Sequence, residues 1–309
     1  MSDHIPSILV PLDGSDLAET IVPLVGRLAS TLRATVSLLH VLEHDAPSQV
    51  HGAQHLADVP TAQGYLDRIA TRLRDAGVSA VELHVHENPE HDVAAAIVQH
   101  AIEFHAELVV LANHGGGGWR EFFFGTIAQQ VIRLGETPVV AVPVRTAAAD
   151  IPSAGLETIT VALDGTDEAE AALAPTSWIA ERYGAPVHIV AAVETTGTLT
   201  GDERALATMI PSATRAVLNL QVEETQAYLD EVVAMFRARN VPATSALLRG
   251  APADVIVAEA KRVQSGLLVL ATHGRSGLSG IWAGSVGSRI LATYGAPLLL
   301  VHAPELPSD

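Results

Sequence analysis

Short apolar runs alternate with longer amphipathic segments along the first half of the chain. Continuous apolar runs predict five strands, at residues 8–12, 35–41, 80–85, 107–112 and 138–144. Between them, apolar residues recur with a helical period, which predicts helices over 16–33, 59–76, 91–105 and 125–135. Strands that are apolar throughout are typical of parallel sheets covered on both faces. The pattern therefore predicts an α/β domain with a doubly wound, five-stranded parallel sheet.

The second half of the chain repeats the first. ILVPLDGSDLAET at 8–20 matches ITVALDGTDEAEA at 159–171, so Asp164 follows Asp13 by 151 residues (164 − 13 = 151). For the later motifs, the interval between matching residues of the two copies is eight residues longer. We expect this extra length in the polar stretch 195–214 of the second copy. The stretch between the copies is small, polar and proline-containing, which is typical of a linker. We predict two such domains in tandem, over 1–146 and 158–309, joined by a linker over 147–157.

The first helix of each copy has a recognisable start. Asp16 is followed by Glu19, and Asp167 by Glu170, which predicts a capping box at each helix. An aspartate also ends the preceding strand, as Asp13 in the first copy. That carboxylate could have either of two roles, and the sequence leaves both open: it caps the turn, or it contacts a ligand directly.

A glycine-rich loop follows the fourth predicted strand of each copy. The loops read ANHGGGGWREFFFGT at 112–126 and ATHGRSGLSGIWAGS at 271–285. In open α/β sheets, ligands bind outside the carboxyl ends of the strands. Thr126 and Ser285 open the helices that follow, and a helix N-terminus presents unpaired N–H groups that favour phosphate. The residues predict two phosphate sites, with a plain flexible connection as the alternative, since neither loop is a Walker A motif.

Composition narrows the class of partner. The chain has 309 residues, a formal net charge of −17 and no cysteine. An acidic chain repels nucleic acid, and without cysteine it has no disulfide, thiolate catalyst or cysteine-bound zinc. The start MSDHIPSILVPLDGS lacks a basic segment before an apolar stretch, and no window is apolar enough to cross a bilayer. We expect a soluble, cytoplasmic protein without nucleic-acid or membrane partners.

Taken together, these motifs resemble the universal stress protein family in its tandem two-domain form. Pro11-Leu12-Asp13-Gly14-Ser15 is similar to the end of the family's first strand, and Leu39-His40-Val41 to the end of its second. The family's ATP-binding pattern, G-x-x-G, nine residues, then G-S or G-T, keeps its nine-residue spacing in both halves. The resemblance implies a flavodoxin-like (Rossmann-like) fold in each half, with ATP and Mg²⁺ as the cofactors of a cleft.

The resemblance also implies which residues contact the nucleotide. Asp13 and Val41 would contact the adenine beside Pro11. Gly115 would lie near the ribose and phosphates, and the last glycine and hydroxyl residue of the loop would hold the phosphates. The implied ATP-binding residues are Pro11, Asp13, Val41, Ala112, Gly115, Gly125 and Thr126 in the first copy, and Asp164, Ala192, Ala271, Gly274, Arg275, Gly284 and Ser285 in the second.

The chain departs from the family pattern at several of these positions. The first glycine of the loop pattern is Ala112 in one copy and Ala271 in the other, a methyl group that a negative φ would tolerate. Alanines replace Pro11 and Val41 in the second copy, which would loosen the adenine slot, and the first copy lacks a counterpart of Arg275. We hypothesise that both halves bind ATP with unequal affinity.

Other chemistry has weaker support in the sequence. No carboxylate has a partner base at recognisable spacing and no lysine lies in either loop, so we assign no catalytic residue and expect slow ATP hydrolysis at most. His40, at a strand end, is interpreted as a buried histidine. Five further histidines are interpreted as surface residues rather than as a metal site: His84, His86, His91, His100 and His105.

Two hypotheses of function follow from these observations. The first is a nucleotide-dependent regulator of stress or growth, whose protein partners the sequence does not identify. The second is a structural interaction module with vestigial clefts, and an enzyme acting on an adenylated substrate is a weaker third. The final strands, at 138–144 and 297–303, resemble the edges that pair two family domains. They imply an internal pseudo-dimer, and a homodimer of the whole chain stays open.

Overall fold

The computed structural model describes residues 4–43, 49–50, 53–54, 56, 58–88, 92–114, 126–144, 156–198, 205–206, 208–273 and 286–303. The chain divides into two compact units. The first comprises Met1–Gly155 and Ala296–His302, and the second comprises Leu156–Gly295 and Ala303–Asp309. Each unit has buried apolar side chains on its strands and helices. Most of the predicted linker, from residue 147 to residue 155, lies outside the described residues.

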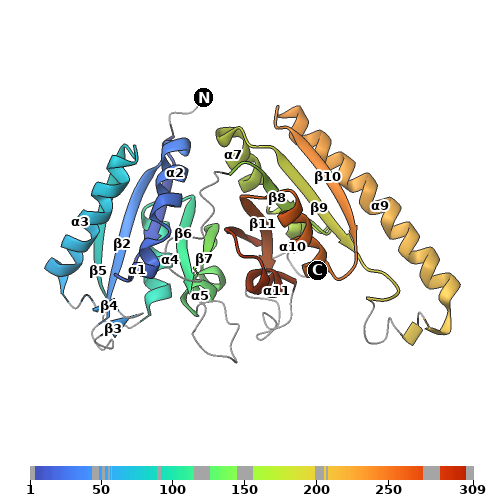
Figure 1. Ribbon diagram of the computed structural model, residues 1–309, viewed down its shortest axis with the longest axis horizontal. Helices are drawn as coiled ribbons and strands as arrows, with labels where there is room; N and C mark the ends of the chain where they lie inside the picture. The colour runs from blue at the N-terminus through green and yellow to red at the C-terminus, as the bar shows by residue number, and fades with distance from the viewer. Residues whose placement is uncertain are drawn as a thin grey trace. The chain divides into compact units, whose positions relative to one another are not determined.

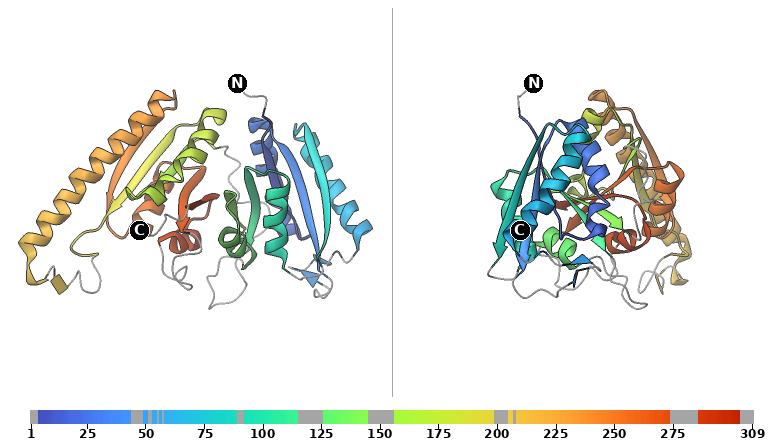
Figure 2. Two further views of the ribbon diagram at one scale, coloured as in Figure 1. Left: turned by 180° about the vertical axis from the view of Figure 1, so that it is seen from behind. Right: turned by 60° about the vertical axis from the view of Figure 1, so that its left-hand side comes forward.

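The first unit is a parallel α/β sheet with helices on both faces. Its five parallel strands have the order β5-β2-β1-β6-β7. Helices α2 and α3 pack together on one face, and α4 and α5 pack together on the other (Figures 1 and 2). The elements are β1 (Ser7–Pro11), α1 (Asp16–Glu19), α2 (Val22–Leu32), β2 (Thr35–Glu43), the small hairpin β3 (Gln49–Val50) and β4 (Ala53–Gln54), α3 (Val59–Asp75), β5 (Ala80–Asn88), α4 (Val93–Glu103), β6 (Leu108–His114), α5 (Thr126–Leu134) and β7 (Val139–Val144).

The second unit repeats the strand order of the first. Its four strands run β10-β9-β8-β11, and every pair is parallel. Its elements are β8 (Ile159–Ala162), α6 (Asp167–Glu170), α7 (Leu173–Tyr183), β9 (Val187–Val193), α9 (Pro211–Ala238), β10 (Ala243–Arg249), α10 (Pro252–Arg262), β11 (Leu267–His273) and α11 (Val286–Thr293). The predicted fold class, two doubly wound flavodoxin-like domains in tandem, is confirmed in both repeats.

The last strand of the chain belongs to the first unit by its contacts. Strand β12 (Leu298–Ala303) pairs antiparallel with β7, with Leu298 opposite Ala141 and Leu300 opposite Val139. Its predicted strand character is therefore confirmed. Its side chains are apolar and buried almost throughout, as expected for a strand that extends a covered sheet.

One predicted helix is divided in the structure, and one helix of the second repeat is longer than its counterpart in the first. The predicted first helix, 16–33, is two helices, because Pro23 lies in the first turn of α2 and has no N–H to continue the ladder from α1. In the second repeat, α9 has 28 residues, whereas its counterpart α3 has 17. Of the stretch 195–214 in which we predicted extra length, residues 199–204 and 207 lie outside the described residues.

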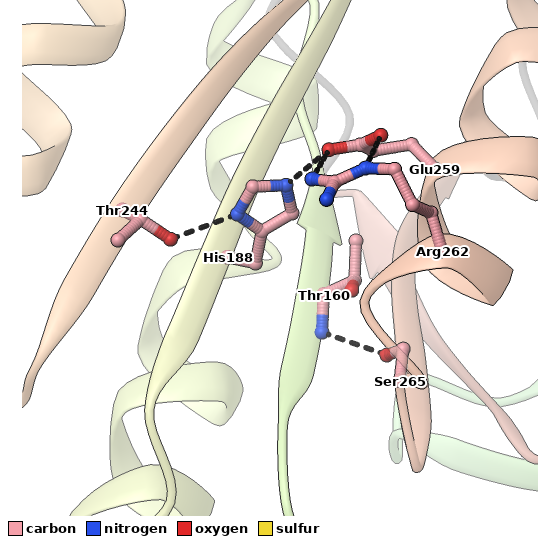
Figure 3. A network of polar contacts seen from close by, with 6 residues as sticks. All are labelled: Thr160, His188, Thr244, Glu259, Arg262 and Ser265. Carbon is pink, nitrogen blue, oxygen red and sulfur yellow. Dashed lines mark hydrogen bonds and ion pairs between the residues drawn. The ribbon is translucent and has the colours of Figure 1, made fainter.

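A buried polar network ties the amino ends of the second unit's strands to α10 (Figure 3). His188 Nε2 donates to the Glu259 carboxylate at 2.9 Å, and His188 Nδ1 lies 2.8 Å from the Thr244 hydroxyl. Arg262 donates two hydrogen bonds, of 2.8 and 2.6 Å, to the same carboxylate. The Glu259 side chain is only 10% exposed, so these partners replace the water it has lost.

The same network lowers the pKa of a buried acid. The Arg262 hydrogen bonds are the main cause that lowers the pKa of Glu259 to about 2, and the His188 hydrogen bond adds to them against the opposing effect of burial. A carboxyl group whose pKa is lowered on folding stabilises the native state above its unfolded pKa. The network lies at the amino ends of the strands, opposite the predicted ligand edge, and we interpret it as structural.

Replacement of this acid should reveal its contribution to stability. Glu259→Gln removes the charge that Arg262 and His188 stabilise, so we expect a loss of about 1–2 kcal/mol at neutral pH. The difference between wild type and variant should shrink as pH falls from 4.5 toward 2, because the wild-type carboxyl then becomes protonated. Thermal midpoints across this pH range measure the effect.

The matched control is Glu231→Gln, which removes an exposed carboxylate of α9 in the same unit. It should leave the midpoint nearly unchanged at every pH. An equal effect of the two substitutions would show that the Glu259 network makes no special contribution to stability.

Candidate functional site

The turn after the first strand of each repeat is built by an aspartate, a glycine and a hydroxyl residue. Asp13 Oδ1 accepts hydrogen bonds from the Ser15 N–H at 2.9 Å and from the Ser15 hydroxyl at 2.6 Å. The Ser15 oxygen in turn accepts from the Ala18 N–H at 3.1 Å, which caps α1. Gly14 has φ of +86°, a conformation that L side chains rarely adopt. The aspartate therefore does cap the turn, and its contact with a ligand stays a prediction.

The second repeat builds the same turn with threonine in place of serine. Asp164 Oδ1 accepts from the Thr166 N–H at 3.1 Å and from its hydroxyl at 2.6 Å. The Thr166 oxygen accepts from the Ala169 N–H at 3.2 Å. Gly165, with φ of +83°, repeats the left-handed glycine of the first turn.

The predicted capping boxes are wrong by one residue. The N-caps are Ser15 and Thr166, both in extended conformation, whereas Asp16 and Asp167 are already the first helical residues. The physical reason is that Asp13 and Asp164 orient the hydroxyls that follow two residues later, so each hydroxyl is already aimed at the helix when it begins. Asp16 and Asp167 still place a negative charge in the first turn of each helix, where it interacts favourably with the positive end of the helix dipole.

Strand register brings four of the predicted site residues of the first repeat together. Pro11, at the end of β1, pairs with Leu39 of β2, so Asp13 and Val41 both extend two residues beyond that pair. On the other side of β1, Leu9 pairs with Val109, which brings Ala112 level with the start of the same turn. The carboxyl edge of three adjacent strands therefore gathers residues that the family resemblance assigns to the nucleotide.

The second repeat has the equivalent register. Ala162 pairs with Val190, which brings Asp164 beside Ala192. Val161 pairs with Val269, and Ala271 follows Val269 by two residues, level with Leu163. The two candidate sites thus rest on the same backbone arrangement.

A buried histidine supports the first of these edges. His40 is 2% exposed, and its Nδ1 lies 2.7 Å from the backbone oxygen of Leu12, which precedes the turn. The bond ties the end of β2 to the end of β1. Our interpretation of His40 as a buried, hydrogen-bonded histidine is confirmed.

The phosphate part of the predicted site lies mostly outside the described residues. This applies to Gly115, Gly125, Gly274, Arg275, Gly284 and Ser285. Helix α5 begins at Thr126 and α11 at Val286, which is where the glycine loops were expected to lead into helices. The roles of the loop residues stay predictions.

The two edges differ in how far neighbouring side chains enclose them. A Cβ added to Gly14 would lie 2.8 Å from Leu56, which approaches the turn from the segment before α3, whereas a Cβ added to Gly165 would meet no atom of the described residues within 4 Å. Ser15 is fully buried and Asp13 is half-buried, but Asp164 and Thr166 are exposed. The first site is therefore the more enclosed of the two.

In each repeat, a tyrosine that interacts with the acidic side chains of the turn region was missed by the sequence reasoning. Tyr65 is 3% exposed, and burial, followed by the charges of Glu19 and Asp13, raises its pKa. Burial and then Glu170 raise the pKa of Tyr228. Internal alignment would have found the pair, because Tyr228 follows Tyr65 by the same interval that separates β10 from β5 (228 − 65 = 163 and 243 − 80 = 163).

The histidines of the first repeat form an aromatic cluster. The His84 ring lies 4.2 Å from that of Phe104, His100 stacks on Phe104 at 5.1 Å, and His86 meets His100 edge-on at 4.9 Å. Burial is the main cause that lowers the pKa of His100. The prediction of surface histidines is wrong for His100, whose side chain is 13% exposed, because Phe104 covers it. His91 lies outside the described residues, and His105 has φ of +48° after the end of α4.

Within the described parts of the chain, no group of three or more histidine, cysteine or acidic side chains is arranged to hold a metal ion. No helix in the same described ranges is long and apolar enough to cross a membrane.

Comparison with known proteins gives this architecture a family. The model of the "Universal stress protein family" matches residues 4–143 and again residues 155–302. The chain belongs to the universal stress protein family. Its tandem form, predicted from the repeated motifs, is confirmed by the two consecutive matches.

Individual relatives agree with the family match. A universal stress protein of Mycolicibacterium smegmatis is 26% identical over 309 residues, which span 96% of each chain. One of Methanocaldococcus jannaschii is 34% identical over 89 residues, a match that spans 29% of this chain and 52% of the relative. The crystal structure of a universal stress protein from Archaeoglobus fulgidus superposes with a TM-score of 0.63 at 15% identity, covering 96% of this chain and 98% of its own. At that identity the likeness shows the fold alone.

The two turns allow a matched test of the hydroxyl that caps each first helix. Ser15→Ala should destabilise the protein by about 1–2 kcal/mol, because it removes the cap and the hydroxyl donor of a half-buried carboxylate. Thr166→Ala, in an exposed turn, should cost less, about 0.5–1 kcal/mol. Thermal midpoints of the two variants measure the difference. A larger loss for Thr166→Ala would show that enclosure of the first turn contributes nothing to its stability.

Proposed function

We propose that this universal stress protein binds ATP, as the Mg²⁺ complex, at the carboxyl edge of the sheet in each repeat. The observation that carries the proposal is the strand register, which gathers Asp13, Val41 and Ala112 at one edge and their counterparts at the other. Edges of this kind are where open α/β sheets bind their ligands. The adenine would lie against Val41 and Pro11, beside the turn.

The phosphates are assigned to the glycine loops and the helices that follow. Helix α5 begins at Thr126, directly after Gly125, so its unpaired N–H groups would face the end of the loop. Gly284 and Ser285 are the matching residues of the second repeat. Gly115, Gly274 and Arg275 complete the proposed set, and Mg²⁺ would be held by the phosphates rather than by any residue that we assign.

The alanines in place of the first loop glycine are compatible with this site. Ala112 lies in β6 and Ala271 in β11, and neither is among the described non-glycine residues with positive φ. Because an extended backbone accepts any side chain, a glycine is not required at these positions. The methyl groups therefore introduce no backbone strain.

The unequal enclosure of the two edges supports unequal affinity. Val41 is 8% exposed at the first edge, whereas Ala192 offers a smaller and half-buried surface at the second. Leu56 closes the first turn from one side. Since apolar contact area contributes to binding, we propose that the first repeat binds ATP more tightly.

A regulatory role fits these residues better than efficient catalysis. The carboxylate nearest the proposed nucleotide, that of Asp13, accepts two hydrogen bonds from Ser15 and is committed to the turn. We propose a cytoplasmic, nucleotide-dependent stress or growth regulator with slow ATP hydrolysis at most. Domain boundaries at 146 and 158, and an internal pseudo-dimer of the repeats, are part of the same proposal.

A second candidate function is a structural interaction module that binds no nucleotide. The observation that favours it is the loss of the first family glycine in both loops, at Ala112 and Ala271. The two candidates differ in whether the purified protein binds ATP at all.

Calorimetric titration with ATP and Mg²⁺ tests the proposal. Gly284→Glu should disable the second repeat and Gly125→Glu the first, so each variant should show one binding event. The event in Gly284→Glu should be the tighter, since it belongs to the first repeat. In the Gly284→Glu background, where only the first repeat binds ATP, Val41→Ala should weaken binding about fivefold, because about 1 kcal/mol of apolar contact is lost. In the Gly125→Glu background, Ala192→Val should strengthen binding by a similar factor.

The exchange of side chains provides its own control, since each variant gives one repeat the residue of the other. Binding that is unaffected by both exchanges would place the adenine elsewhere. If the wild-type protein shows no binding, and no nucleotide is recovered after heat denaturation, the interaction module is the correct function.

A further inference from the structure

The first half of α9 has no sheet beneath it. Its counterpart α3 buries side chains along its whole length, from Ala62 to Leu73. In α9 the buried side chains are confined to the C-terminal part, at Leu229, Val232, Val233 and Phe236. Figure 1 shows why, because the N-terminal part of this long helix extends beyond the ends of β9 and β10.

This projecting half exposes a set of apolar side chains. On the helix, Val217 is 56% exposed and Leu220 is 54% exposed. With Ala213 they follow spacings of four and three residues, so they share one face of the helix. Just before the helix, Met209 and Ile210 are 80% and 49% exposed. Contiguous exposed apolar surface of this kind is typical of an interaction site.

The exposed face is separate from the face that packs on the sheet. Leu229 follows Leu220 by nine residues (229 − 220 = 9), which is about 2.5 helical turns. Leu220 therefore points away from the direction in which Leu229 is buried. A helix without tertiary packing is marginal in water, and the N-cap Ile210 makes no side-chain hydrogen bond. A partner on this face would stabilise the projecting half.

The charge distribution points to a second copy of this chain as that partner. The chain has 35 acidic residues among 309, yet residues 205–222 contain none. Their one charged residue is Arg215, two positions before Val217 and so on the opposite side of the helix. Two copies with a net charge of −17 each repel over most of their surface, and this segment is where they can approach without opposing carboxylates.

We propose that the first half of α9 pairs antiparallel with the same segment of a second copy, about a two-fold axis. An isologous contact of this kind uses one patch on both subunits. The small side chains of Ala213 and Ala216 would let the helices approach closely, and Glu224, one turn beyond Leu220, ends the apolar face. The paired segment is short, so we expect it to bury less than the about 1,200 Å² that a stable interface requires. The dimer is therefore weak and concentration-dependent. The contact is independent of nucleotide binding.

Single cysteines give a direct test, because the chain has none of its own. Val217→Cys should form a disulfide-linked dimer under mild oxidation at micromolar concentration, because residue 217 lies in the middle of the apolar face and meets its own counterpart across the two-fold axis. Glu231→Cys is the matched control, since residue 231 is exposed on the same helix but lies 14 residues farther on (231 − 217 = 14). This control should form no disulfide-linked dimer, whereas equal crosslinking of both variants would overturn the proposed register.

Sedimentation velocity over a concentration series tests the contact without crosslinks. The wild type should self-associate, and the double variant Val217→Ser with Leu220→Ser should weaken the dimer at least about tenfold. Because both side chains are exposed, the thermal midpoint should hardly change. Unchanged association of the variant would place the dimer contact on another surface. A monomeric wild type that floats with phosphatidylcholine vesicles would show that the face binds lipid instead.

Discussion

The turn after the first strand is the constraint on which the rest of each candidate site depends. One carboxylate oxygen of Asp13 holds both the N–H and the hydroxyl of Ser15, and that hydroxyl starts the first helix. The left-handed Gly14 lets the chain reverse in so few residues. Because these bonds are internal to the turn, the edge of the sheet keeps its shape whether or not a ligand is present.

The two repeats show how one backbone arrangement can have two different surroundings. Their turns match bond for bond, yet Ser15 is fully buried and Thr166 is exposed. The difference comes from neighbours such as Leu56, which approach from other segments of the chain. Sequence divergence between the repeats has therefore changed the enclosure of the site and left the hydrogen bonds that build it intact.

The second repeat diverges most at its periphery. Helix α9 is longer than α3, and its extra turns bury none of the side chains that a packed helix would bury. The polar network around Glu259 lies at the amino ends of the strands, away from the proposed ligand edge and from the projecting half of this helix. Stability, ligand binding and association are thus assigned to separate parts of the same unit.

The sequence by itself determined the fold class, the tandem repeat and most helix and strand positions, because continuous apolar runs and helical periodicity report directly on burial. It also placed Asp13, Val41 and Ala112 at strand ends, which parallel pairing then aligns at one edge. The tertiary structure alone decided that Ser15 rather than Asp16 caps the first helix, since a hydrogen bond between side chains sets that choice. It alone showed that Leu56 encloses one edge, that Phe104 covers His100, and that half of α9 is uncovered. Each of these depends on contacts between residues distant from one another or on the length of a neighbouring strand, which local patterns along a chain do not encode.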